Sequence, residues 1–150
     1  MSVGPQLALL IESACKRLVL ESLFRVDQQD YAGLTALFTE QARLYRPTAG
    51  GHPLVGRQAI FDAYAQRPGE RISRHLCSNQ RVDIDTAKRA RVHSYAQVFS
   101  ALADSREEVS ALPQVQSPVM IGEFEDICVL EQGSWLIAER RARFVMQLAN

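Results

Sequence analysis

The hydrophobic periodicity of the chain changes from helical to strand-like about halfway along, and this change constrains the fold more than any other feature. In the N-terminal part, apolar side chains such as Ile11, Ala14 and Leu18 recur at helical spacing. From Ile72 onward, apolar and polar residues alternate with the period of a half-buried strand. Helices followed by a run of strands are typical of an α+β domain, in which helices pack on one face of a sheet.

Local signals divide the chain further. The expected helical part comprises a helix that starts after Pro5 and ends near Asp27, a helix over 31–38 capped by Asp30, a strand over 42–46, and a helix opened by Gly56 and ended by Pro68-Gly69. The expected strands cover 72–85, 87–103, 119–130 and, after the turn Gln132-Gly133, 135–146. Residues 104–118 are expected to form an exposed loop. We therefore predict a cone-shaped, curved, mixed or antiparallel sheet packed against N-terminal helices.

Composition sets limits on domain number and on partners. A chain of 150 residues is expected to form a single domain over 1–150. Lys and Arg together number 17, as do Asp and Glu, so the net charge of zero argues against a nucleic-acid partner. The three cysteines show neither disulfide nor zinc spacing, which favours a reducing, cytoplasmic location. No membrane span or signal peptide is expected.

Candidate catalytic residues lie on two segments that are distant in sequence. Strand alternation places Ser73, His75, Cys77 and Asn79 on one face, which is too polar for an ordinary core face. Asp27 lies at the end of the first helix. If the helix end meets this strand, the carboxylate accepts a hydrogen bond from the imidazole and leaves the second ring nitrogen as a base. The residues alone also allow Asp27 to be a helix-end turn residue and His75 an ordinary polar group.

Several segments together resemble a known family. They are LFRVDQQDYAGLTALFTEQARLYRP, LVGRQAIFDAY, RHLCSN, RARVHSY, GEFEDICVLEQGSW and the final strand. In order and spacing, these segments resemble the SnoaL-like branch of the nuclear transport factor 2-like superfamily over residues 10–146. Within that branch the chain is most similar to the scytalone dehydratases and the hexachlorocyclohexane dehydrochlorinases.

The resemblance implies roles for particular residues. Asp27 and His75 match the general-base dyad of both enzymes, and Asn79 matches the asparagine of the dehydrochlorinase pattern H-x-x-x-N. Tyr45 matches the strand tyrosine of the dehydratases, which helps to hold a water molecule against the substrate carbonyl. The chain departs from the dehydratases at Val26, where they have a second tyrosine, and from the dehydrochlorinases at Glu131, where they have an arginine. The specificity residues of neither enzyme are thus retained as a set.

Other residues are weaker candidates. Arg143 is a candidate for binding an acidic substrate, although the run 140–143 is also typical of a solvated strand edge. His93 is expected to face solvent or a partner, and Trp135 to anchor the sheet. Cys77 is a poor nucleophile candidate because no base other than His75 is near it in sequence. No metal-ligand spacing occurs, so we expect neither a metal nor another cofactor.

Three functions remain open on this basis. The first is a cofactor-free lyase acting on a small cyclic or aromatic hydroxy or keto compound, with His75 as base, Asp27 setting its tautomer, and Tyr45, Asn79 and Arg143 contacting the substrate. The second is an isomerase that uses the same base. The third is a non-catalytic ligand-binding or assembly module. The resemblance also implies a homo-oligomer, a trimer slightly favoured over a dimer, formed through the outer sheet face that carries Arg91, His93, Tyr95, Gln97 and Phe99.

Overall fold

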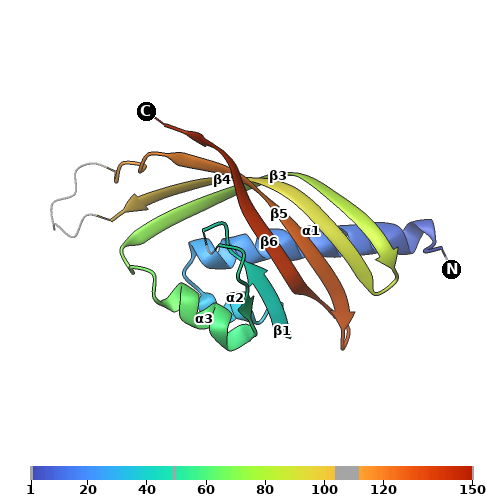
Figure 1. Cartoon of the computed structure of the whole chain (residues 1–150). Coiled ribbons are helices and arrows are strands. Elements are labelled where there is room, and N and C mark those ends of the chain that lie inside the picture. Colours follow the sequence, from blue (N-terminus) through green and yellow to red (C-terminus); the bar gives the residue numbers. More distant parts are fainter. Residues whose placement is uncertain (1, 49, 104–111, 150) are drawn as a thin grey trace.

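The computed structural model describes residues 2–48, 50–103 and 112–149. Its elements in chain order are α1 (Pro5–Asp27), α2 (Tyr31–Thr35), β1 (Phe38–Tyr45), β2 (Leu54–Val55), α3 (Arg57–Ala65), β3 (Arg71–Thr86), β4 (Arg89–Leu102), β5 (Val119–Glu131) and β6 (Ser134–Leu148). Figure 1 shows long, bent strands β3–β6 sweeping over α1, with α2 and α3 gathered at one side. The predicted α+β architecture with a curved sheet is confirmed.

The sheet is mixed, and its strand order is β2-β1-β6-β5-β4-β3. The strands β3 to β6 form an antiparallel meander, as the turn signals predict. The final strand β6 then pairs with β1 in parallel, with Leu44 opposite Arg140. This pairing brings the early strand next to the C-terminal one and joins the helical part of the chain to the meander.

The first helix behaves as its sequence pattern indicates. Pro5 occupies the first turn, where its missing N–H costs no helical hydrogen bond. The apolar stripe that includes Ile11, Leu18 and Val19 is buried, and α1 contacts β3, β4 and β6. The core therefore lies between α1 and the sheet. No helix among the described residues is long and apolar enough to span a membrane.

Two short elements differ from expectation. The predicted helix over 31–38 ends at Thr35, and Phe38 instead begins β1, where it is fully buried opposite Ile137. Tertiary packing of this one aromatic side chain outweighs the weak helical pattern. The strand β2 was not predicted because two residues show no periodicity.

The predicted cap and turn are present. The Asp30 carboxylate accepts a hydrogen bond from the Gly33 N–H at 2.9 Å and caps α2. Gln132 and Gly133 have φ values of 48° and 82° and form the turn between β5 and β6. Of the loop predicted over 104–118, residues 112–118 contain neither helix nor strand, and 104–111 lie outside the described residues.

Candidate active site

Asp27 and His75 are in direct contact. The Asp27 Oδ1 atom lies 2.6 Å from His75 Nδ1, and Oδ2 accepts the His75 backbone N–H at 2.8 Å. The Ser73 hydroxyl donates to Oδ1 at 2.9 Å. Only 9% of the Asp27 side chain and 12% of the His75 side chain are exposed. The carboxylate thus holds the imidazole through its ring and its backbone at once.

Local structure explains how residues 48 positions apart meet. Helix α1 ends at Asp27, and Gln29, in the short connection to α2, has a positive φ of 56°. The Gln29 side-chain amide donates to the carbonyl oxygens of Gly69 and Arg71 at 3.0 and 2.8 Å. These bonds fix the helix end against the start of β3, and alternation along β3 directs both Ser73 and His75 toward it.

The electrostatics of the pair fix its protonation pattern. Burial raises the pKa of Asp27, but the ring and backbone hydrogen bonds from His75 and the bond from Ser73 outweigh it, so the pKa lies below its ordinary value. An ionised carboxylate can only accept hydrogen bonds, so His75 Nδ1 must carry the proton. In the neutral imidazole, Nε2 is then the unprotonated nitrogen and is available as a base.

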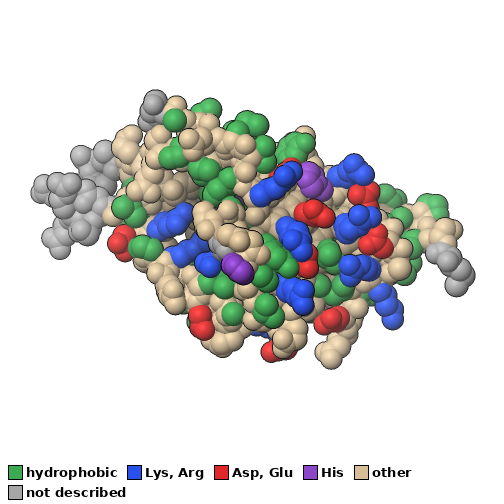
Figure 2. All heavy atoms as spheres, in the orientation of Figure 1, with side chains coloured by type: hydrophobic (Ala, Val, Ile, Leu, Met, Phe, Trp, Pro, Cys, Tyr) green, Lys and Arg blue, Asp and Glu red, His purple; other side chains and the backbone are tan. Residues whose placement is uncertain are grey.

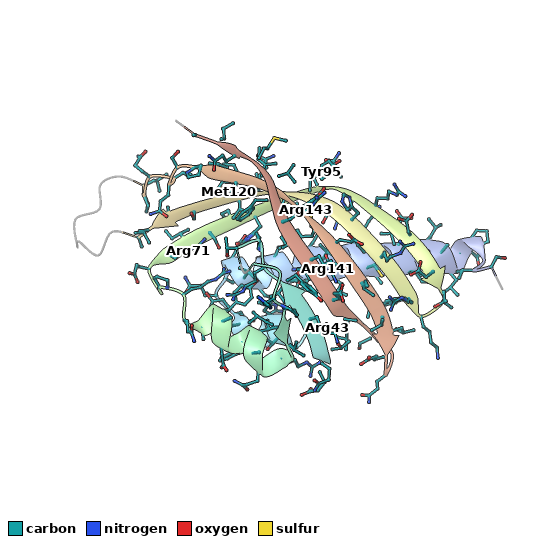
Figure 3. The ribbon with its side chains drawn as sticks, viewed as in Figure 1. Arg43, Arg71, Tyr95, Met120, Arg141 and Arg143 are labelled. Carbon is teal, nitrogen blue, oxygen red and sulfur yellow. The ribbon has the colours of Figure 1, made fainter. Side chains whose placement is uncertain are left out.

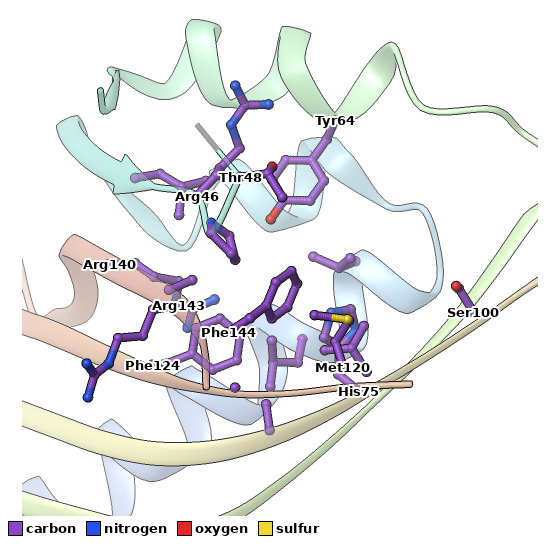
Figure 4. A pocket seen from close by; sticks show the side chains of 18 of the residues that line it. Arg46, Thr48, Tyr64, His75, Ser100, Met120, Phe124, Arg140, Arg143 and Phe144 are labelled. Carbon is purple, nitrogen blue, oxygen red and sulfur yellow. The ribbon is translucent and has the colours of Figure 1, made fainter. Parts of the chain in front are cut away.

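The His75 side chain lines a cavity of about 540 Å³, a size that suits a small organic molecule. Figure 4 shows Phe124, Phe144 and Met120 on the sheet side of this space, with Tyr64 of α3 opposite them. Other apolar wall residues are Leu23, Val26, Leu44, Ala96, Val98 and Ala142. Asp27 is not part of the wall, so the base faces the cavity and its carboxylate partner lies behind it.

A buried ion pair forms part of the same wall. Arg140 donates through Nε to Asp126 Oδ1 at 2.6 Å and through Nη2 to Ser22 Oγ at 2.8 Å. Only 3% of the Arg140 side chain and none of the Asp126 side chain are exposed. Burial alone would lower the pKa of Arg140, but the facing Asp126 raises it, so the guanidinium remains charged. The prediction of a solvated edge over 140–143 is therefore wrong at Arg140.

Tyr45 and Asn79 do not lie where their predicted substrate roles require. Leu44 faces the cavity, so its neighbour Tyr45 faces the opposite side of β1, where the Arg141 guanidinium stacks 3.9 Å from its ring centroid. Asn79 has a φ of 53° within the register shift between Ser78 and Arg81 and is exposed. This bulge interrupts the alternation that had placed Asn79 beside His75. Neither side chain lines the cavity.

Arg143 borders the cavity, but its guanidinium lies on the outer face, where it is already neutralised. Its guanidinium forms an ion pair with Glu123 on the neighbouring strand, and 76% of the side chain is exposed. Figure 3 shows Arg43, Arg141 and Arg143 along β1 and β6. On the face seen in Figure 2, basic and acidic side chains are interspersed over the strands.

The remaining candidates divide between the two faces of the sheet. His93 Nε2 lies 3.2 Å from Glu123 Oε2 on the outer face, next to Tyr95, as its predicted outward orientation requires. Burial raises the pKa of the Cys77 thiol, which keeps the nucleophilic thiolate scarce. Trp135 packs against the core. Within the described ranges, no group of three or more His, Cys, Asp or Glu side chains forms a metal site.

Some cavity residues were missed at the level of sequence. Arg46, Arg67 and Arg71 all line the cavity, and only Arg46 lies in a segment that carries the family resemblance, where it was assigned no role. The buried Arg140–Asp126 ion pair has a clearer signal in the sequence. Asp126 alternates with Phe124 and Cys128, so period two places a carboxylate on an apolar face, where it requires a buried cation.

Comparison with known proteins supports this arrangement at the level of family and fold. Residues 8–141 match the family described as SnoaL-like domain. The chain belongs to this family. No curated protein matches its sequence. The resemblance inferred from the sequence motifs is therefore confirmed.

Solved structures of similar fold have low sequence identity to this SnoaL-like chain. A provisionally assigned scytalone dehydratase from Novosphingobium aromaticivorans has a TM-score of 0.77 and 19% identity, covering 98% of this chain and 92% of that one. A type 2 hexachlorocyclohexane dehydrochlorinase (LinA) has a TM-score of 0.79 and 13% identity, covering 98% and 93%. A provisionally assigned dehydratase of the NTF2-like family from Streptomyces avermitilis has a TM-score of 0.74 and 13% identity, covering 89% and 96%. At these identities the similarity establishes the fold alone.

Proposed function

We propose that this SnoaL-like protein is a cofactor-free lyase that eliminates water or halide from a small cyclic compound, with His75 as the general base. The observation that carries the proposal is the Asp27–His75 pair, 2.6 Å apart, with the imidazole at the wall of an apolar cavity. A carboxylate that holds Nδ1–H leaves Nε2 free to accept a proton from a bound molecule. That the similar folds include enzymes named as dehydratases and a dehydrochlorinase supports elimination over other uses of such a base.

The proposed reaction begins at a C–H bond next to a carbonyl group. His75 Nε2 takes the proton, and the electrons of the C–H bond form a carbon–carbon double bond as the neighbouring C–O bond breaks. The departing oxygen takes up the proton from the imidazolium and leaves as water, which restores the neutral base. A positioned base of this kind contributes about 10²–10⁴-fold to the rate.

Polarisation of the carbonyl group requires a donor other than Tyr45, which faces away from the cavity. We assign this role to the phenol of Tyr64, which lines the cavity on the side opposite the sheet (Figure 4). Arg140 lies in the same wall and is held in place by its ion pair with Asp126 and its hydrogen bond to Ser22. Both groups are set in place before a substrate enters, so little reorganisation is needed during the reaction.

The test uses a bicyclic β-hydroxy ketone, 3-hydroxy-1-tetralone, whose dehydration gives 1-naphthol, together with a carboxylate-bearing analogue. We expect the wild-type protein to release water from at least one of them and His75→Gln to lose about 10²-fold or more of the rate. His93→Gln, on the outer face, is the matched control and should retain the rate. A product of unchanged mass would indicate isomerisation instead, and turnover equal in wild type and His75→Gln would contradict the proposal.

We also propose that copies of the chain associate through the outer face of β4. Arg91, Tyr95 and Gln97 are exposed there, and His93 is partly exposed beside them. Light scattering is expected to show a trimer or a dimer, and Tyr95→Arg should weaken the association. A monomeric wild-type protein at micromolar concentration would contradict this.

A further inference from the structure

Basic residues outnumber acidic ones in the lining of the cavity. Among the described residues that line it, Glu123 is the single acidic one, and its carboxylate pairs with His93 and Arg143 on the outer face of the sheet. The basic residues of this lining are Arg46, Arg67, Arg71, Arg140 and Arg143, of which Arg143 directs its guanidinium to the outer face. An apolar cavity needs few charged groups, so an excess of one sign in its wall indicates the charge of the molecule that it binds.

Two of these arginines are already neutralised. Arg140 is paired with Asp126, and Arg143 with Glu123. The Arg67 guanidinium stacks over the Tyr64 ring, 4.2 Å from its centroid. These three groups therefore have partners within the protein.

Arg46 and Arg71 do not. Within residues 2–48, 50–103 and 112–149, no carboxylate oxygen lies within ion-pair distance of either guanidinium. The Nε atoms of both side chains are buried and have no hydrogen-bond partner. Buried N–H donors in folded proteins are nearly always paired, so two unpaired donors in one cavity wall indicate a partner beyond the described residues, either water or a bound group. An anionic oxygen group fits, because the guanidinium fork binds such groups through charge-assisted hydrogen bonds.

The location of these arginines separates the anion from the reacting carbon. Arg71, Ser73 and His75 share one face of β3, and Arg71 opens this strand (Figure 3). Four residues of strand place the Cα atoms of Arg71 and His75 about 13 Å apart. Arg46 directly follows β1, two residues after the cavity-facing Leu44. A ligand held by Arg46 and Arg71 can therefore extend its apolar body along the cavity toward His75.

We propose that the substrate of this site is an organic anion with an apolar ring body, whose carboxylate or phosphate group is bound by Arg46 and Arg71. The inference rests on the proposed function in that the same cavity holds the reacting group next to His75. It goes further by assigning the substrate class. Because the anionic group is remote from the reacting carbon, it acts on binding, so its loss raises KM and leaves kcat largely unchanged.

Calorimetric titration with three probes of similar shape tests the inference: 2-naphthoate, 2-naphthyl phosphate and the neutral 2-naphthamide. We expect the wild-type protein to bind one of the two anions about tenfold or more tightly than the amide. The anion that binds more tightly distinguishes a carboxylate from a phosphate ester. The double variant Arg46→Gln/Arg71→Gln should lose this preference yet bind the amide as the wild type does, which shows that its cavity is intact.

Arg43→Gln/Arg74→Gln is the matched control, because it removes the same charge from exposed positions three residues away from Arg46 and Arg71. It should keep the preference for the anion. Equal affinity of the wild type for all three probes would overturn the inference, as would the same loss in the control variant. His75→Gln should also keep the preference, so a failure of the catalytic proposal leaves this result unaffected and the two can be separated.

Discussion

Replacement of Asp27 by Asn is expected to move the ring proton of His75 from Nδ1 to Nε2 while only slightly destabilising the fold. The backbone N–H of His75 is a fixed donor, so the amide oxygen of Asn must occupy the position of Oδ2, 2.8 Å from it. The amide NH₂ then occupies the position of Oδ1 and faces Ser73 Oγ and His75 Nδ1. The hydroxyl can accept its hydrogen bond, and Nδ1 can do so only if the ring proton moves to Nε2.

The magnitudes follow from this exchange of donors and acceptors. All the contacts of Asp27 are kept in Asp27→Asn, and only their charge-assisted part is lost, so we expect a cost of about 1–2 kcal/mol in the free energy of unfolding. Asp27→Ala leaves the buried donors of Ser73 and His75 without an acceptor and should cost about 3 kcal/mol or more. Since Nε2 is protonated in Asp27→Asn, its catalytic rate should fall by about 10²–10⁴-fold despite the small loss of stability.

Two assays on the same variants check the reasoning. Urea unfolding followed by the fluorescence of Trp135, the single tryptophan, gives the free energies. Long-range ¹⁵N–¹H spectra of histidine-labelled protein give the tautomer of His75. Asp30→Asn, which keeps an N-cap oxygen at a partly exposed position, is the control and should leave the tautomer unchanged. An Asp27→Asn protein whose His75 still carries its proton on Nδ1 would refute the reasoning.

Three further predictions concern stability. Asp126→Ala leaves the buried Arg140 unpaired and should lower the free energy of unfolding in urea by about 3–5 kcal/mol. The double variant Asp126→Leu/Arg140→Met should cost much less. A cost below about 1 kcal/mol for the single variant would contradict the role of the pair. Gly122→Ala places a Cβ 2.5 Å from the Arg143 carbonyl oxygen and should cost about 1–3 kcal/mol, unlike Gly69→Ala, whose Cβ meets no atom within 4 Å; equal costs would argue against this clash. Because the pKa of Asp27 in the folded protein lies below its ordinary value of 3.8, its contribution to stability is complete above that value and is lost as the pH falls through the folded pKa. The free energies of unfolding of wild type and Asp27→Asn, measured in urea, should therefore converge in acid. A constant difference at all pH values would oppose the assignment.

Much of the fold could be predicted because it depends on local patterns. The long strands and α1 each repeat one hydrophobic period over many residues, and Asp30 and Gln132-Gly133 mark a cap and a turn by their chemistry. The short α2 and β2 contain too few residues for a period. Their limits are set by contacts with distant residues, as the burial of Phe38 opposite Ile137 illustrates.

The candidate site was predictable only in part. The family resemblance marked Asp27 and His75, and the structure brings them into contact. For Tyr45 the resemblance was misleading, although simple alternation with Leu44 already assigns the two side chains to opposite faces of a strand. The bulge at Asn79 has no clear signal in the sequence, since a register shift depends on the pairing with β4.

The central claim is that His75 removes a proton from carbon inside this cavity, and hydrogen exchange in D₂O tests it without a leaving group. The probe is 2-tetralone, whose acidic C–H bonds exchange with solvent when a base acts on them, and the loss of their ¹H NMR signal gives the rate. The account predicts that the wild-type protein accelerates this exchange about 10²-fold or more over His75→Gln, with His93→Gln equal to the wild type. Exchange at the same rate in wild type and His75→Gln would contradict it.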